Sequence, residues 1–211
     1  KPGGGLGGGV IKRVGKKLGG RFGLSFVGFL VFVFVGRGGL GSPPRTPAEK
    51  KVTVFIASRS ETFARSEELS RRRPEGLRAV EVRCAVPDSM YFDVYLSIWG
   101  YTQADILILP ADLIDEGALS ERFSPISASY AASVGRLGTL DADGSIYGIR
   151  VFDAAARESL IADIAWGEGD DVTDYYLLFG RNSAHLGGLS ETDGVGADGA
   201  VARVAELLME L

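Results

Sequence analysis

The sequence predicts an α/β fold over residues 52–211, a single lobe built on a doubly wound mixed sheet that is flanked by helices. Two observations predict it. Short, strongly apolar runs recur at 52–57, 79–86 and 104–109, and segments with helical spacing separate them. A strand–helix–strand–helix–strand order within about sixty residues is typical of a parallel sheet with helices on its faces.

The three apolar runs differ in pattern. Residues 52–57 (VTVFIA) are rich in β-branched side chains, which indicates a strand buried on both faces. Residues 79–86 alternate between apolar and charged side chains, which indicates a strand with one wetter face. Residues 104–109 (ADILIL) predict a third buried strand, which Pro110 ends.

Two helices are predicted between these strands. The first covers residues 60–72, with Ser60 as its N-cap. The second begins at Asp88, and its apolar side chains recur at the spacing of one helix face: Tyr91, Val94, Tyr95 and Ile98.

The second half of the domain has weaker patterns. Residues 123–126 predict a surface extension and residues 141–144 a turn. Strands are expected at 146–152 and 174–179. A closing helix is expected at 200–211, with one apolar face formed by Val201, Val204, Ala205 and Leu208.

Charge is distributed unevenly along the chain. Residues 1–51 hold ten Lys or Arg and one acid, a net charge of +9, whereas residues 52–211 hold thirteen Arg and twenty-six acids, a net charge of −13. The predicted domain is therefore acidic, and a basic surface that binds nucleic acid is not expected.

Residues 22–36 are a run of fifteen uncharged residues that follows a basic, Gly-rich leader at 1–21. This pattern is typical of a signal peptide. As a helix the run would span roughly 22 Å against a hydrocarbon core of about 30 Å, so a retained anchor with flanking arginines at the interfaces is the alternative. The absence of a clear small-x-small cleavage site favours the anchor over cleavage and secretion, and a buried core segment is the least expected alternative. Residues 37–51 read as a flexible linker, and the charge bias places the domain outside the cytoplasm.

Catalytic and metal-binding patterns are lacking in the sequence. His185 is the single histidine and Cys84 the single cysteine, so a His- or Cys-based metal site is not expected. Asp141–Gly144 begins like a calcium loop, but Ile146 stands where that loop needs glycine. The sequence predicts no enzyme activity, no catalytic residue and no cofactor.

Four stretches, taken in order, resemble the extracellular solute-binding proteins of ABC transporters, especially the sugar-binding type. They lie at 52–61 (VTVFIASRSE), 104–127, 141–153 (DADGSIYGIRVFD) and 174–187 (DYYLLFGRNSAHLG). In the third, Arg150 stands where the family usually has proline. About twenty residues separate the strands at 146–152 and 174–179, where the family inserts its second lobe, so the chain resembles the first lobe alone.

The resemblance implies a membrane-tethered solute-binding protein of an ABC transport system, with a sugar or another small solute as ligand and an ABC permease or other membrane protein as partner. Ligands of open α/β sheets lie beyond the carboxyl ends of the strands. The expected ligand-binding residues are therefore Ser58, Arg59, Ser60, Pro110, Asp112 and Tyr147. Arg59 would pair with an anion or hydrogen-bond sugar hydroxyls, unless it is an ordinary surface arginine. Trp99 and Tyr101 would stack on a sugar or, more simply, pack.

A second hypothesis follows from the missing lobe. A single lobe offers half a cleft, and two-lobed binding proteins bury a ligand by closing around it. The chain would then be a non-enzymatic, anchored interaction module that docks on another membrane protein.

Overall fold

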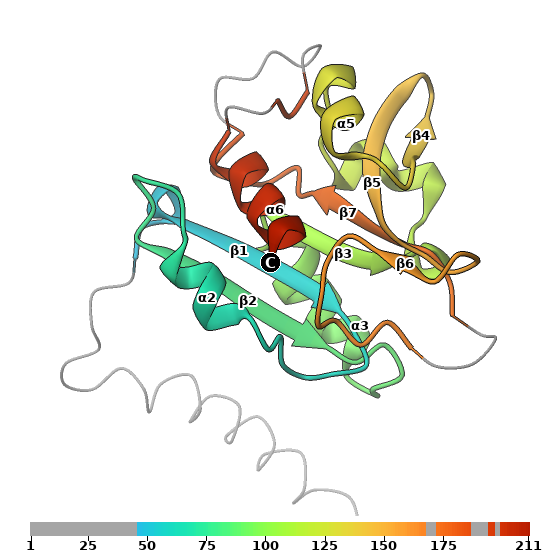
Figure 1. The fold of residues 1–211 in the computed structure, drawn as a ribbon, viewed down its shortest axis with the longest axis horizontal. Coiled ribbons are helices and arrows are strands. Elements are labelled where there is room, and N and C mark those ends of the chain that lie inside the picture. The colour runs from blue at the N-terminus through green and yellow to red at the C-terminus, as the bar shows by residue number, and fades with distance from the viewer. Residues whose placement is uncertain (1–45, 168–171, 187–193, 197–198) are drawn as a thin grey trace, which may run out of the picture. The chain divides into compact units, whose positions relative to one another are not determined.

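A mixed β-sheet organises the residues that the structure describes, and seven strands are found within them (Figure 1). The structure is a computed structural model that describes residues 46–167, 172–186, 194–196 and 199–211. The expected leader, membrane segment and most of the linker, residues 1–45, lie outside these residues. None of the helices in the described ranges is long and apolar enough to cross a bilayer.

The strand order is β2-β1-β3-β7-β5-β4, and the short β6 pairs with β5. The strands are β1 (Lys51–Ala57), β2 (Ala79–Ala85), β3 (Ile106–Pro110), β4 (Thr139–Ala142), β5 (Ser145–Asp153), β6 (Glu158–Ser159) and β7 (Tyr175–Phe179). β1 is parallel to β2 and β3, whereas β7 is antiparallel to both β3 and β5. β5 therefore runs in the direction of β1, β2 and β3, and all four strands end at the same edge of the sheet. This edge is called the carboxyl edge below.

These strands confirm the predicted α/β fold with a mixed sheet flanked by helices. The structure adds β4 and β6, which the sequence patterns did not indicate. β4 and β5 form a hairpin around Asp143 (φ 50°) and Gly144 (φ 77°), a pair of positive φ angles that suits a tight hairpin turn. The predicted turn is thus confirmed at 143–144, while residues 141–142 belong to β4.

Helices cover both faces of the sheet. The α-helices are α2 (Ser66–Arg71), α3 (Phe92–Tyr95), α4 (Leu119–Arg122), α5 (Ala128–Val134) and α6 (Ala200–Glu210). A π-helix, η2 (Leu96–Tyr101), continues α3, and the short 3₁₀ helices are η1 (Ala48–Lys50), η3 (Ala111–Leu113) and η4 (Glu116–Ala118). α6 crosses one face of the sheet beside α2 (Figure 1).

Alternate residues of β1 divide between two apolar cores. Val54 and Ile56 belong to the core that includes side chains of α2, α5 and α6. Phe55 belongs to the other core, where its ring lies 6.3 Å from that of Phe92 in α3. A strand buried on both faces needs apolar side chains at successive positions, which explains the continuous apolar run at 52–57. The predicted face of α6 is confirmed, because Val201, Val204, Ala205 and Leu208 are all buried.

The predicted helix at 60–72 is shorter in the structure. α2 begins at Ser66 with Arg65 as its N-cap, so the prediction of Ser60 as the cap is wrong. The Ser60 hydroxyl instead donates to the carbonyl oxygen of Thr62 and accepts from its N–H. Such local bonds between a serine side chain and the backbone compete with helix formation.

The helix predicted from Asp88 is also displaced. α3 begins at Phe92 with Tyr91 as its N-cap, and the residues facing the sheet are Phe92, Leu96 and Gly100. The predicted apolar face is wrong for three of its four members, because Tyr91, Val94 and Ile98 are 47–54% exposed. A Cβ atom at Gly100 would lie 2.9 Å from Leu96 and 3.4 Å from Leu107, so this close approach to the sheet decides which face is buried.

The predicted surface extension at 123–126 is wrong. Phe123 and Ile126 are buried, and each makes an isolated β-bridge, Phe123 to Gly180 and Ile126 to Ile146. The segment therefore continues the packing of the sheet around β7 and β5.

Candidate functional site

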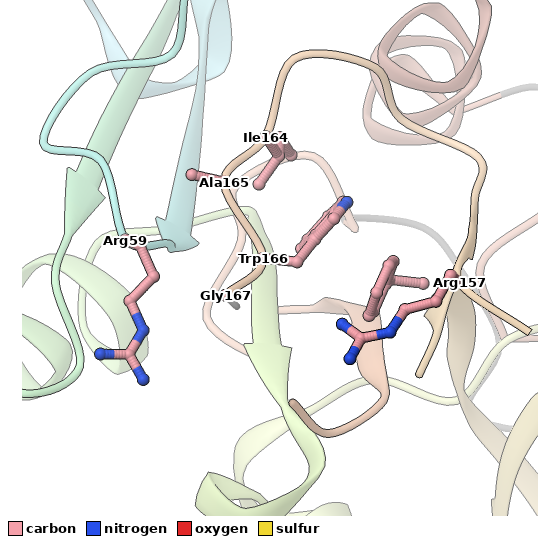
Figure 2. A pocket seen from close by; sticks show the side chains of 7 residues that line it. Arg59, Arg157, Ile164, Ala165, Trp166 and Gly167 are labelled. Carbon is pink, nitrogen blue, oxygen red and sulfur yellow. The ribbon is translucent and has the colours of Figure 1, made fainter. Parts of the chain in front are cut away.

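A pocket of about 570 Å³ lies at the carboxyl edge of the sheet (Figure 2). Three segments contribute to it: Arg59 after β1, the end of β5 with the turn that follows it, and the connection from β6 toward β7. The residues that line it are Arg59, Phe152, Arg157, Ile164, Ala165, Trp166 and Gly167. This volume is in the range of sites that bind small ligands.

Arg59 is held in place at both its backbone and its side chain. Its N–H donates to the carbonyl oxygen of Ala165 over 2.9 Å, which joins the end of β1 to the opposite wall of the pocket. Its guanidinium forms an ion pair with Asp88, a residue that follows β2. Both side chains are at least half exposed, so the pair orients the arginine but adds little stability.

Three aromatic rings form the apolar wall of the pocket and the core behind it. Trp166 lies nearly parallel to Phe152, with ring centroids 5.3 Å apart, and 4.8 Å from Tyr175. The polar atoms of this cluster are paired internally. The indole N–H of Trp166 donates to the Ser159 hydroxyl (3.1 Å), and the Tyr175 hydroxyl donates to the Trp166 carbonyl oxygen (3.0 Å). These bonds fix the orientation of the Trp166 ring.

Arg157 lies in the turn between β5 and β6. Its φ is 55°, an uncommon value for a residue other than glycine. The turn is closed by the Asp153 carboxylate, which accepts from the N–H of Ala156 over 2.9 Å. In the view of Figure 2 the Trp166 side chain lies between those of Arg59 and Arg157.

The electrostatic environment of Tyr175 shows which charges surround the cluster. Burial raises the pKa of the Tyr175 phenol, the positive charge of Arg59 lowers it, and the negative charges of Asp112 and Asp88 raise it. The phenol therefore stays protonated near neutral pH and remains a donor to Trp166. Asp112, which follows β3, lies close enough to contribute to this field.

The structure brings some of the sequence-predicted residues together and separates others. Arg59 lines the pocket, while Asp112 lies on the same edge of the sheet in η3. Pro110 is buried at the end of β3, where it pairs with Tyr175 of β7. Tyr147 is only 8% exposed and lies in the apolar core with α3, not in the pocket lining.

The hydroxyl groups of Ser58 and Ser60 make hydrogen bonds within the protein. The Ser58 hydroxyl, in a residue that is 2% exposed, donates to the carbonyl oxygen of Ser60 over 2.7 Å. The Ser60 hydroxyl is bonded to Thr62, as described above. Both serines thus shape the loop that presents Arg59.

Trp99 and Tyr101 pack rather than line the pocket. The Trp99 ring stacks on Tyr95 with centroids 4.3 Å apart, and the Arg83 guanidinium lies 5.4 Å from its centre. Tyr101 meets Phe123 edge-on at 6.1 Å.

Sequence reasoning missed Phe152, Arg157 and Trp166. The last two lie between β5 and β7, in the stretch that the resemblance treated as the place of a missing lobe. The signal that would have indicated Trp166 is the recurrence of apolar residues at Leu160, Ile161, Ile164 and Trp166, which is too dense for an exposed connection.

The described lining can bind a ligand through charge and apolar contact. Among the described residues, two guanidinium groups and an aromatic wall form the lining, and none of these lining residues is a nucleophile or a general base. Within the described part of the chain, no group of three or more His, Cys, Asp or Glu residues is placed to hold a metal ion. The prediction of no enzyme activity stays a prediction.

No model of a known protein family matches the chain, and no curated protein matches it.

Proposed function

We propose that this chain is a membrane-tethered, extracytoplasmic solute-binding-like protein, a component of an ABC transport system for sugars or other small solutes. The pocket at the carboxyl edge of the sheet is the observation that carries the proposal. It lies where ligands of open α/β sheets bind, beyond the carboxyl ends of the parallel strands. The sequence resemblance supplies the class of protein, and residues 22–36 supply the expected tether.

Two features of the pocket support a binding role. The aromatic wall is held rigidly by the bonds of Trp166 to Ser159 and Tyr175, which reduces the entropy lost when a ligand binds. The Arg59 side chain is oriented by Asp88 before any ligand arrives. A rigid apolar surface beside oriented donors is what a small polar ligand needs for specific binding.

The test is a titration of the full chain, purified in a mild detergent, with neutral sugars, acidic sugars and amino acids by isothermal calorimetry. Ala165 lines the pocket and is exposed, so Ala165→Trp fills the pocket without disturbing the core. Ala162 is exposed three residues earlier and does not line the pocket, so Ala162→Trp is the matched control.

We expect saturable binding that Ala165→Trp weakens at least tenfold, about 1.4 kcal/mol, and that Ala162→Trp leaves unchanged. If no solute binds to the full chain, or if both tryptophan variants bind like the natural protein, the proposed function is wrong.

A second candidate function rests on the exposed apolar side of α3 and η2. Met90, Tyr91, Val94 and Ile98 are 47–85% exposed, and the described residues include no segment that covers them. Exposed apolar side chains that gather into a large patch mark interaction sites. The exposed Asp93 on the same helix adds negative charge, so the fitting partner is a membrane protein with an apolar contact surface and basic residues around it.

Photo-crosslinking in intact cells separates the second candidate from the first. A photoreactive residue at Tyr91 should give an adduct with a membrane protein that Asp93→Lys weakens. The same residue at Arg203, an exposed position on α6, is the control. An adduct that forms equally from Arg203, or none at all from Tyr91, rules out this interaction surface.

A further inference from the structure

We infer that the solute bound beside Trp166 is acidic, a small sugar or sugar-like ring that carries a carboxylate or a phosphate. This inference rests on the proposed function, because it names the ligand class of the same pocket. It follows from the donors and acceptors that the pocket presents.

Among the described residues, the charged side chains that line the pocket are both cationic. They are Arg59 and Arg157, and the other described lining residues are apolar or glycine. Arg59 follows β1 and Arg157 lies in the turn between β5 and β6, so the tertiary structure brings them together. Guanidinium groups have five N–H donors and no acceptor, and their planar fork matches a carboxylate or a phosphate.

Two backbone acceptors of the pocket lining are engaged within the protein. The Ala165 carbonyl oxygen accepts from the Arg59 N–H, and the Trp166 carbonyl oxygen accepts from the Tyr175 hydroxyl. The Trp166 indole nitrogen donates to the Ser159 hydroxyl. An acidic sugar carries, besides its hydroxyl groups, an anionic group that accepts from guanidinium N–H donors, and a neutral sugar lacks this group.

The Asp88 carboxylate shows how an anion would be held. It already pairs with the Arg59 guanidinium, so the geometry that the loop imposes allows this arginine to donate hydrogen bonds to a carboxylate. Asp88 engages Nη1, which leaves other N–H groups of the fork for a second oxygen ligand. Both side chains are at least half exposed, so salt should weaken the binding of an anion by screening.

The test compares matched pairs of probes on the full chain by calorimetry. Glucuronate and glucose 6-phosphate are each compared with glucose, and acetate and inorganic phosphate supply the anion without the ring. We expect the acidic sugars to bind at least tenfold more tightly than glucose and more tightly than acetate or phosphate. Arg157→Gln replaces the guanidinium at this exposed position by a neutral amide and should remove most of that preference.

Two further variants sharpen the result. Arg157→Lys keeps the charge but loses the fork, and should bind with intermediate affinity. Arg203→Gln removes an exposed arginine on α6 that does not line the pocket, and should change nothing.

Three outcomes would contradict the inference, and they differ in whether the proposed function stands. If glucose binds as tightly as the acidic sugars and Ala165→Trp abolishes both, the inference is overturned while the proposed function stands. If acetate or phosphate binds as tightly as the acidic sugars, the ring is not recognised and the inference is overturned. If none of the probes binds, both the inference and the sugar-binding function are contradicted.

Discussion

Asp105 is the buried carboxyl that joins three parts of the fold at the amino end of β3. It is 6% exposed, and one of its oxygens accepts from the N–H of Thr53 in β1 over 2.7 Å. The other accepts from the hydroxyl of Ser183, in the loop after β7. That loop also brings the His185 ring nitrogen to 2.7 Å from the carbonyl oxygen of Lys51. We predict that replacing Asp105 lowers the free energy of unfolding, because the bonds that this carboxyl makes to the loop and to β1 are lost.

The expected magnitude follows from the two bonds. Asp105→Ala leaves the Thr53 N–H without its acceptor at a residue that is 2% exposed, at a cost of about 1–3 kcal/mol. The part-buried Ser183 hydroxyl loses its acceptor for about 1 kcal/mol more, although it regains some hydration. Removing a buried carboxylate offsets part of this loss, so we expect Asp105→Ala to lower the free energy of unfolding by about 2–3 kcal/mol.

Asp105→Asn is the matched variant. Its amide oxygen can still accept from Thr53, while its NH₂ group donates to Ser183, whose hydroxyl turns to accept. We expect it to change stability by no more than about 1 kcal/mol near neutral pH. Urea unfolding followed by tryptophan fluorescence measures both variants, with the slope checked for equality. If alanine costs nothing, or asparagine costs as much as alanine, the reasoning is wrong.

The pH dependence of the folding stability is a second test of the Asp105 carboxyl. Burial raises the pKa of the Asp105 carboxyl, against the opposing effects of the hydrogen bonds from Ser183 and Thr53 and of the charges on His185 and Lys51. Because the folded pKa is above the unfolded one, the stabilising contribution is complete below the ordinary aspartate pKa of about 3.9 and is lost as the pH rises through the folded value. Asparagine does not ionise, so the stability of Asp105→Asn relative to the natural protein should rise across that interval. A constant difference between pH 4 and pH 7 would contradict the raised pKa.

Three further predictions concern other parts of the fold. A Cβ at Gly180 would lie 2.3 Å from the Ala104 carbonyl oxygen, so Gly180→Ala should lower the free energy of unfolding by about 1–3 kcal/mol in a urea titration, and an unchanged midpoint would contradict that contact. Burial raises the pKa of the Cys84 thiol to about 11, opposed by its hydrogen bond with Ser58. Its alkylation at pH 8 should therefore be slow in the folded protein and fast in urea, and equal rates would refute the burial. Trp166→Ala should cost about 3–5 kcal/mol and lower the melting temperature by roughly 6–20 °C, whereas a smaller shift would mean that the aromatic cluster is not packed as described.

The strands of the core were predictable from sequence because burial on two faces leaves a strong local signal. β1 and β3 have apolar side chains at successive positions, and the expected segments agree with the observed strands within two residues at each end. α6 was predictable for a related reason, since its apolar residues follow the helical period and the C-terminal segment contains no competing pattern.

The helix after β2 shows where local pattern is insufficient. Its sequence offers two apolar faces, one with Tyr91, Val94 and Ile98 and another with Phe92 and Leu96. Both have helical spacing, so periodicity alone does not choose between them. The absence of a side chain at Gly100 lets one face approach the sheet closely, and that contact decides the choice.

The candidate site was only partly predictable. That Arg59 would lie at the carboxyl edge followed from its position directly after a predicted parallel strand, together with the rule for ligand sites in such sheets. That Arg157 and Trp166 lie beside it did not follow, because they are separated from Arg59 by about a hundred residues and their placement depends on β5 running parallel to β1.

The sequence by itself determined the α/β class, the buried strands and the acidic character of residues 52–211, because these depend on composition and on short-range periodicity. The tertiary structure alone decided the strand order, the face of α3 that is buried and the union of two arginines with an aromatic wall. These depend on which distant segments pair, since the hydrogen bonds and packing that join β7 to both β3 and β5 leave no mark at any fixed spacing along the chain.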